Sequence, residues 1–368
     1  MIEFAGWLMP VRYSSDLAEH LVVRSGVGLF DLSHMGEIMV VGPGAADALD
    51  YALVGRASGI EIGRAKYTMI CAEDGGVIDD LVAYRLASDK FMIVANAGNA
   101  AIVVGELQER CSGFECEVLD ECAQTALIAV QGPRALEVIE VLVDPEHVPV
   151  VSSLRYYASA PAFVEGRPLH IARTGYTGED GFEFFCPADR AERLWDLTME
   201  KGAAMGITPC GLAARDTLRL EAGMALYGHE LSLEATPFEA GLGRVVHFGG
   251  SEEPRADFVG RSALEEAAAR ARAWEENPDS APSEARVLVG LVGEGKRSPR
   301  GGYSILGPEG VVGEVTSGAP SPTLGYPIAM GYVHPRHSVI GGRLEVDVRG
   351  RREEMAVTAL PFYNRQKS

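Results

Sequence analysis

Two adjacent aspartates, Asp79 and Asp80, stand where the turn and apolar run GGVIDDLVAYRL begins. Neighbouring residues of an extended strand point to opposite faces. Arg85 shares the face of Asp79, which predicts that this face is solvated and that Asp80 points among apolar neighbours. An ionised carboxylate there is costly without a partner, so Asp80 is a candidate functional residue. The alternative is that both aspartates only cap the Gly-Gly turn.

A second group of polar residues lies in RTGYTGEDGFEFF, residues 173–185. Glu179 and Asp180 are expected at a Gly-rich turn. Glu183 is expected on a strand between two phenylalanines, where burying it alone would be expensive. This carboxylate is therefore a second candidate.

The segment CGLAARDTLRLEAGMALYGHEL follows, and its pattern predicts a helix from about Leu212. Arg215 and Arg219 are four residues apart, so they share one helical face, with Asp216 beside them. These charges could serve a site. The alternative is an internal ion-pair network with a structural role.

The motif FDLSHMG contains Asp31, Ser33 and His34, the residue types of a hydrolase triad. Adjacency in sequence is not triad geometry, and the nucleophile motif Gly-x-Ser-x-Gly is missing from the chain. The sequence therefore disfavours a serine hydrolase. We expect His34 and Met35 to be wall residues of a core or pocket.

The composition narrows the class of protein further. The 368 residues include 52 acidic and 33 basic ones, and the net charge of -19 disfavours nucleic acid and anionic lipid as partners. The six cysteines form no Cys-x-x-Cys pair, so we expect reduced, structural cysteines and no metal site. The sequence shows neither a signal peptide nor a long apolar run, which predicts a cytoplasmic protein without a membrane span.

The order of the elements predicts an α+β protein. Residues 1–261 alternate β-rich runs, such as 36–42 and 125–132, with helical ones such as 189–203. Residues 262–286 begin as an Ala-rich helix and continue as a Pro, Ser and acid-rich linker. Residues 287–368 contain short strands separated by Gly and Pro turns, which predicts a small antiparallel barrel or sandwich.

Taken together, several motifs resemble the aminomethyltransferase family, the T-proteins of the glycine cleavage system. They are FAGWLMPV, FDLSHMG, GGVIDDL, NAGN, QGP, TGYTGEDGFE, GLAARDTLRLEAGMALYG, TPFEAGLG, VTSGAPSPTL, AMGYV and LPFYNR, and they cover nearly the whole chain in order. The resemblance implies a three-domain cloverleaf around a central hole that holds tetrahydrofolate, with two intertwined α+β domains in residues 1–261 and the barrel last.

The implied reaction starts from the aminomethyl group that the dihydrolipoyl arm of the H-protein carries. Ammonia leaves, and tetrahydrofolate receives the one-carbon unit as 5,10-methylenetetrahydrofolate. The tetrahydrofolate cofactor and the lipoylated H-protein are thus the implied ligand and partner.

Residues carry over from the family by motif. The resemblance implies that Asp80 is the catalytic aspartate and that Glu183 holds the pterin edge, where a carboxylate can accept two parallel N–H bonds. It implies further folate contacts by Arg215, Tyr67, Met35, Asn96, Tyr176 and, at the C-terminal end, Arg365. Asp79 matches no functional position and is expected to be a turn or surface carboxylate.

Two other functions fit the same motifs. One is a folate-dependent demethylase of the same fold, and the other is a non-enzymatic folate-binding protein, although the Lys-Gly-Cys-Tyr-x-Gly-Gln-Glu signature of the latter is missing. The chain also departs from the family pattern at Arg244, where a tryptophan is common, and in having little sequence ahead of FAGW. The linker after residue 262 is longer than usual, which we interpret as a surface insertion.

Overall fold

The structure is a computed structural model that describes residues 1–250 and 255–365. The chain forms two compact units. Met1–Ile70 and Asp79–Arg215 make up the first unit, and Cys71–Ile78 together with the chain from Asp216 onward makes up the second.

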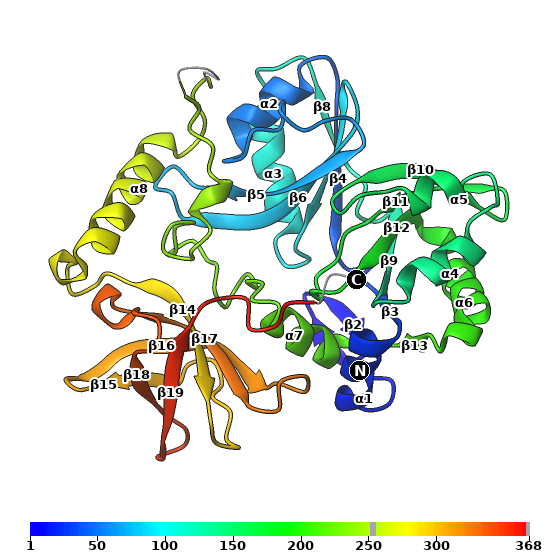
Figure 1. Ribbon diagram of the computed structural model, residues 1–368. Coiled ribbons are helices and arrows are strands. Elements are labelled where there is room, and N and C mark those ends of the chain that lie inside the picture. Colours follow the sequence, from blue (N-terminus) through cyan, green and yellow to red (C-terminus); the bar gives the residue numbers. More distant parts are fainter. Residues whose placement is uncertain (251–254, 366–368) are drawn as a thin grey trace. The chain divides into compact units, whose positions relative to one another are not determined.

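A six-stranded sheet forms one half of the first unit, with the strand order β10-β11-β12-β9-β3-β13. Helices α4 (Ala135–Leu142) and α6 (Ala191–Gly202) pack together on it, as Figure 1 shows. Its strands are β3 (Gly28–Asp31), β9 (Thr125–Gln131), β10 (Ser159–Val164), β11 (Arg167–Ala172), β12 (Gly181–Pro187) and the short β13 (Thr208–Pro209). The apolar core between sheet and helices includes Ile128, Val138 and Phe182, so this sheet has a dry face.

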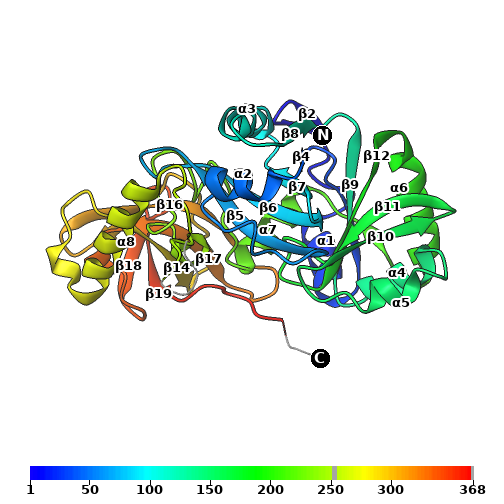
Figure 2. The same ribbon diagram turned by 90° about the horizontal axis from the view of Figure 1, so that it is seen from above.

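A five-stranded antiparallel sheet carries the other half of the first unit, in the order β5-β6-β7-β4-β8. Its strands are β4 (Gly36–Val41), β5 (Arg64–Cys71), β6 (Val77–Ala87), β7 (Lys90–Ala95) and β8 (Glu117–Asp120). Helices α2 (Ala45–Ala52) and α3 (Ala100–Cys111) pack against each other and against this sheet (Figure 2). The face of the sheet under the helices is buried, and the residues of the opposite face remain available for a site.

Shorter elements complete the first unit. They are the hairpin of β1 (Ile2–Phe4) and β2 (Trp7–Met9), helix α1 (Asp16–Ser25) and helix α5 (Val148–Ser152). Helix α7 (Leu212–Glu221) begins in the first unit and ends in the second. Glycine is required just before it, because a Cβ on Gly211 would lie 2.4 Å from the carbonyl oxygen of Val11.

The second unit contains a closed six-stranded barrel in the order β14-β17-β16-β15-β18-β19. Its strands are β14 (Val287–Gly293), β15 (Ser304–Gly307), β16 (Gly310–Pro320), β17 (Pro327–Val333), β18 (Arg343–Asp347) and β19 (Arg352–Thr358), and β14 closes the barrel against β19. Valine, leucine and isoleucine side chains fill its interior. Helix α8 (Arg261–Glu276) precedes the barrel.

The Gly-Gly turn between β5 and β6 packs within the second unit. Gly75 has φ +86°, which favours glycine, and a Cβ on Gly76 would lie 2.0 Å from the carbonyl oxygen of Leu233. The amide of Val77 donates to the carbonyls of Ser232 and Ala235, both at 3.1 Å. The two glycines therefore serve a close approach of backbones as well as a turn.

The α+β class and the C-terminal antiparallel barrel that the sequence predicts are confirmed. The expected strands at 36–42 and 125–132 and the helix at 189–203 appear within a few residues of those limits. All six cysteines are free thiols. Within residues 1–250 and 255–365, no helix is both long and apolar enough to span a bilayer.

Candidate active site

Asp80 lies on β6 and accepts hydrogen bonds from two neighbouring strands. The hydroxyl of Tyr67, on β5, donates to Asp80 Oδ2 at 2.9 Å. The side-chain amide of Asn96, just after β7, donates to Asp80 Oδ1 at 2.7 Å. Burial and the charge of Asp80 raise the pKa of Tyr67 well above its ordinary value. Tyr67 therefore remains a neutral donor, and two hydrogen bonds fix the position of the Asp80 carboxylate.

Asp79 is fully buried, which corrects the expectation of a turn or surface carboxylate. Its Oδ2 accepts the backbone amide of Asn96 at 2.9 Å, and its Oδ1 accepts the side-chain amides of Asn96 and Asn99, both at 2.8 Å. Burial and the neighbouring Asp80 raise the pKa of Asp79 to about 7, against the opposing effect of these donors. Asp79 thus organises the two asparagines around the site.

The expectation that Asp80 is on the drier face of β6 is wrong, because Asp80 is only partly buried and Asp79 is inaccessible. Arg85 misled the prediction. Its guanidinium donates to the carbonyl oxygens of Ser58 and Ile60 and stacks over the ring of Phe91, so it marks no solvated face. The face of Asp80 is the wetter one.

Glu183 lies on β12, as expected, and its carboxylate has several partners. The Thr174 hydroxyl donates to Oε2, and the hydroxyl of Tyr84, on β6, donates to the same oxygen at 3.4 Å. Burial raises the pKa of Glu183, and the Thr174 bond, the charge of Arg215 and the Tyr84 bond oppose this effect. Glu183 is therefore a partly buried acceptor with donors on its Oε2.

Arg215 of α7 and Tyr176 are in contact, with the guanidinium carbon 4.8 Å from the ring centre. Tyr176 interacts electrostatically with Tyr67, and Arg215 does so with Glu183. The predicted residues Asp80, Tyr67, Asn96, Glu183, Arg215 and Tyr176 are thus brought together in the first unit.

The Gly-rich loop before β12 is shaped by Gln131 at the end of β9. A Cβ on Gly175 or Gly181 would lie 2.0 or 2.3 Å from atoms of the Gln131 side chain. Gln131 Nε2 donates to the carbonyl of Thr174 at 3.0 Å, and the Thr177 hydroxyl donates to Gln131 Oε1 at 3.0 Å. The two glycines let this amide hold the loop that carries Thr174 and Tyr176.

Tyr157 is a site residue that the sequence did not reveal. It has φ +61°, an unfavourable backbone conformation for a bulky side chain, and its hydroxyl interacts electrostatically with both Glu183 and Asp80. Burial first, and nearby groups that include Glu183 and Asp80, raise the pKa of Tyr157 above its ordinary value. No motif marks this position, because positive φ in a tyrosine has no sequence signature.

The loop before β4 supplies Met35, which is half-buried, and His34, which is 4% exposed. Burial and Arg215 lower the pKa of His34 to about 3, so the ring is neutral. Ser33 Oγ accepts the amide of Leu127, and among the described residues His34 Nδ1 has no hydrogen-bond partner. The apparent triad of this motif is therefore not formed.

Arg365 belongs to the second unit and is partly buried, and its role in folate binding stays a prediction. Arg244 is exposed in the short helix Gly243–Val245. Arg219, on the same helical face as Arg215, instead belongs to an internal network. It pairs with the buried Glu230 at 3.0 Å and donates to Ser317 Oγ at 2.8 Å.

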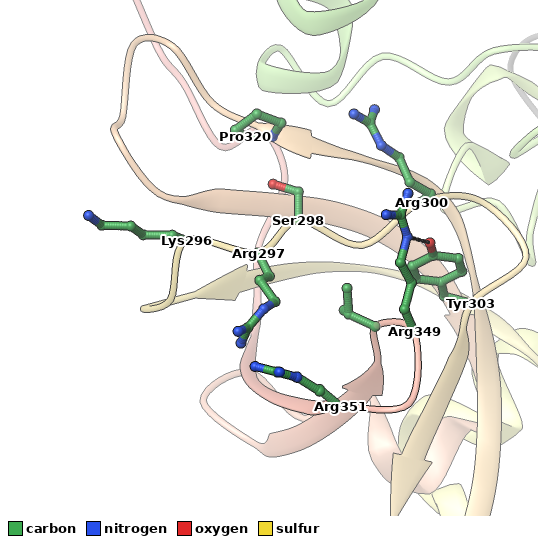
Figure 3. A pocket seen from close by; sticks show the side chains of 9 residues that line it. Lys296, Arg297, Ser298, Arg300, Tyr303, Pro320, Arg349 and Arg351 are labelled. Atoms are coloured by element: carbon green, nitrogen blue, oxygen red, sulfur yellow. Dashed lines mark hydrogen bonds between the residues drawn. The ribbon is translucent and has the colours of Figure 1, made fainter.

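Two pockets lie away from these residues. One, of about 500 Å³ on the barrel, is lined by the cationic side chains of Lys296, Arg297, Arg300, Arg349 and Arg351 (Figure 3). The other, of about 620 Å³ in the first unit, is lined in part by Arg64, Lys66 and Arg155. Neither is lined by any of the predicted site residues, so neither replaces the cluster around Asp80 and Glu183.

The arrangement offers one partly exposed carboxylate held by two donors, and a second carboxylate beside an arginine and two tyrosines. The first can stabilise a developing positive charge. The second can accept N–H groups from a planar polar ligand.

Comparisons with known proteins agree over the whole chain. Residues 1–250 match the family described as the GCVT N-terminal domain, and residues 286–364 match the glycine cleavage T-protein C-terminal barrel domain. An aminomethyltransferase of Streptomyces avermitilis is 56% identical over all of this chain and 94% of its own length, and one of Moorella thermoacetica is 43% identical over the same shares. The crystal structure of the glycine cleavage system aminomethyltransferase T from Bartonella henselae is 36% identical, with a TM-score of 0.84, over 98% of this chain and 93% of that one.

Proposed function

Since this chain belongs to the glycine cleavage T-protein family of aminomethyltransferases, we propose that it transfers the one-carbon unit of an aminomethyl group to tetrahydrofolate. The group would arrive on the dihydrolipoyl arm of the H-protein, and the products would be 5,10-methylenetetrahydrofolate and ammonia. The observation that carries this proposal is the pair of carboxylates in one site, Asp80 with two donors and Glu183 beside Arg215.

The residues fit a reduced folate. The hydroxyl donors of Glu183 meet its Oε2, and a carboxylate can accept parallel N–H bonds from an aminopyrimidine. The rings of Tyr67 and Tyr176 and the side chain of Met35 offer apolar surface to a flat heterocycle. Asn96 and Arg215 would complete the binding residues, and Arg365 is the C-terminal candidate.

Bound tetrahydrofolate would supply the amine nucleophile that accepts the carbon. The role of Asp80 follows from its surroundings. Tyr67 and Asn96 fix its carboxylate, so its negative charge would be in place before positive charge appears on the carbon as ammonia leaves. Asp79 would act indirectly, by holding Asn96 through two hydrogen bonds.

The test is a reconstituted turnover assay. The protein is incubated with tetrahydrofolate and aminomethyl-loaded lipoyl H-protein, and ammonia and methylenetetrahydrofolate are measured. We expect stoichiometric formation of both. The opposite result would be folate binding, measured by calorimetry, with no turnover of a verified loaded H-protein. That result would favour a demethylase of the same fold or a non-enzymatic folate-binding protein.

A further inference from the structure

Glu37 on β4 is a buried carboxyl group that the proposed reaction does not use. Its exposed fraction is 0%, and across the described residues neither side-chain oxygen has a hydrogen-bond partner. Its backbone carbonyl accepts the amide of Glu121 and the thiol of Cys122. An ionised carboxylate in such a place would be very costly, so this side chain is expected to carry a proton.

The strand register places Glu37 on the face of the sheet that bears the site. Glu37 is opposite Val94 of β7, and Val94 is opposite Val82 of β6, so the three residues form one row. Residues two apart on a strand share a face, and Val82 therefore points to the same side as Asp80 and Tyr84. Glu37 thus faces the side from which Tyr84 reaches Glu183.

Titratable groups on β12, and one just after β8, interact electrostatically with the Glu37 carboxyl. They are Glu183 and Cys186 of β12, and Cys122 directly after β8. Burial raises the pKa of Cys122 to about 12 and that of Cys186 to about 11, so both thiols are neutral. Of these three neighbours, Glu183 is the one whose charge raises the pKa of Glu37.

The two glutamates differ in their hydrogen-bond donors. Glu183 has the hydroxyls of Thr174 and Tyr84 and the charge of Arg215, whereas Glu37 has none of these. When two interacting carboxyls share a buried space, the proton resides on the one whose surroundings stabilise charge less. Burial first, and the charge of Glu183 second, raise the pKa of Glu37 to about 9.

We propose that Glu37 is a positioning residue that remains a neutral carboxylic acid and thereby keeps the negative charge of the pair on Glu183, where the pterin edge is bound. This inference rests on the proposed folate site. If Glu37 ionised, the second charge would compete for Arg215 and the Thr174 hydroxyl and would draw water into the site. A bound ligand excludes that water, so the ligand binds best to the form with neutral Glu37.

The first experiment tests the protonation itself, without folate. Glu37→Gln keeps the shape of the neutral acid, so the variant should fold. In the wild type, the unfolded chain releases this proton near the ordinary glutamate pKa, whereas the folded chain retains it. The free energy of unfolding of the wild type should therefore fall relative to that of the variant as the pH rises from about 5 to about 9. The ratio of the two unfolding constants should change by up to about tenfold per pH unit.

Glu117→Gln, the same exchange at an exposed site on the adjacent β8, is the matched control and should show a much smaller change with pH. At pH 8.5, above the pKa of about 7 of Asp79 and below the pKa of about 9 of Glu37, the infrared band of protonated carboxylic acid should decrease in Glu37→Gln and be retained in Glu117→Gln. A stability difference between the wild type and Glu37→Gln that does not vary with pH, or an unchanged infrared band, would overturn the proposal.

The second experiment measures the affinity for 5-formyltetrahydrofolate, a stable reduced folate, by calorimetry. At pH 7 the wild type and Glu37→Gln should agree within about twofold, because both present a neutral group at position 37. Above pH 9 the wild type should lose affinity relative to the variant. A ratio of affinities that stays constant from pH 7 to pH 10 would refute the link to the ligand. Absence of binding by the wild type at pH 7 would count against the proposed function, and the first experiment would still decide the protonation of Glu37.

Discussion

Asp79 and Asp80 are joined by one side-chain amide, since Asn96 Nδ2 lies 2.8 Å from Asp79 Oδ1 and 2.7 Å from Asp80 Oδ1. Two adjacent carboxyls on opposite faces of β6 therefore share a donor. The buried one fixes the position of the amide, and the accessible one receives its second hydrogen. This division of roles distinguishes the two aspartates more sharply than their positions in the sequence do.

Asp80→Asn should remove most of the activity while leaving the fold intact. The change removes the negative charge that would stabilise the reacting carbon, and the loss of one such group costs about 100- to 1,000-fold in rate. Turnover and folate affinity should be measured together, with affinity expected to change little. Asp89→Asn, an exposed aspartate beside the β6–β7 turn, is the control and should be fully active. Wild-type turnover by a folded Asp80→Asn protein would contradict the assignment.

Asp79→Asn should be destabilising, because Asp79 is fully buried and is not the turn or surface carboxylate expected from the sequence. The new NH₂ group would face N–H donors from Asn96 and Asn99, and a buried donor without an acceptor costs about 1–3 kcal/mol. The free energy of unfolding should be measured at pH 8.5, above the pKa of about 7, where Asp79 carries its charge. A stability equal to that of the wild type at this pH would show that the asparagines do not depend on Asp79.

Glu183→Ala should weaken folate binding more than it affects stability. Hydrogen bonds to a charged group contribute about 1.5–3 kcal/mol each, so the loss of one or two predicts a decrease in affinity of at least about tenfold. Calorimetry with 5-formyltetrahydrofolate measures this directly. Glu137→Gln, which breaks only the exposed pair with Arg134, should bind normally. An unchanged affinity in Glu183→Ala would argue against its role at the pterin edge.

His34 should contribute to acid denaturation. Its pKa is lowered to about 3 in the folded chain, whereas an unfolded histidine titrates near 6.5. The unfolded state therefore binds a proton that the folded state does not, and stability falls as the pH decreases from about 6.5 towards 3, by up to about 1.4 kcal/mol per pH unit. In His34→Gln this contribution is removed, so the stability difference from the wild type should vary with pH below 6.5 and be constant above 7. A constant difference at every pH would refute the prediction.

Arg219→Leu should destabilise the second unit strongly. Arg219 is 1% exposed and pairs with Glu230, which also accepts the amide of Leu226 at 2.9 Å. Removing one partner of a buried pair leaves an uncompensated charge and costs about 3–5 kcal/mol. Arg297→Leu breaks an exposed pair with Glu353 and should cost less than about 1 kcal/mol. Thermal unfolding of both variants should therefore differ clearly, and equal shifts would contradict the buried-network interpretation.

The sequence by itself determined which segments form strands and helices, the C-terminal barrel and the chemical types at the site. Alternation and helical periods depend on neighbouring residues only, so strand β4, strand β9 and helix α7 could be predicted from local patterns.

Only the tertiary structure decided which face of β6 is dry, because that depends on the helices packed over the sheet. Arg85 therefore misled the prediction for Asp79 and Asp80. The partners of Asp80 come from β5 and from the end of β7, and Glu37 interacts electrostatically with Glu183 of another sheet. Such contacts join residues far apart in the chain, and no local period encodes them.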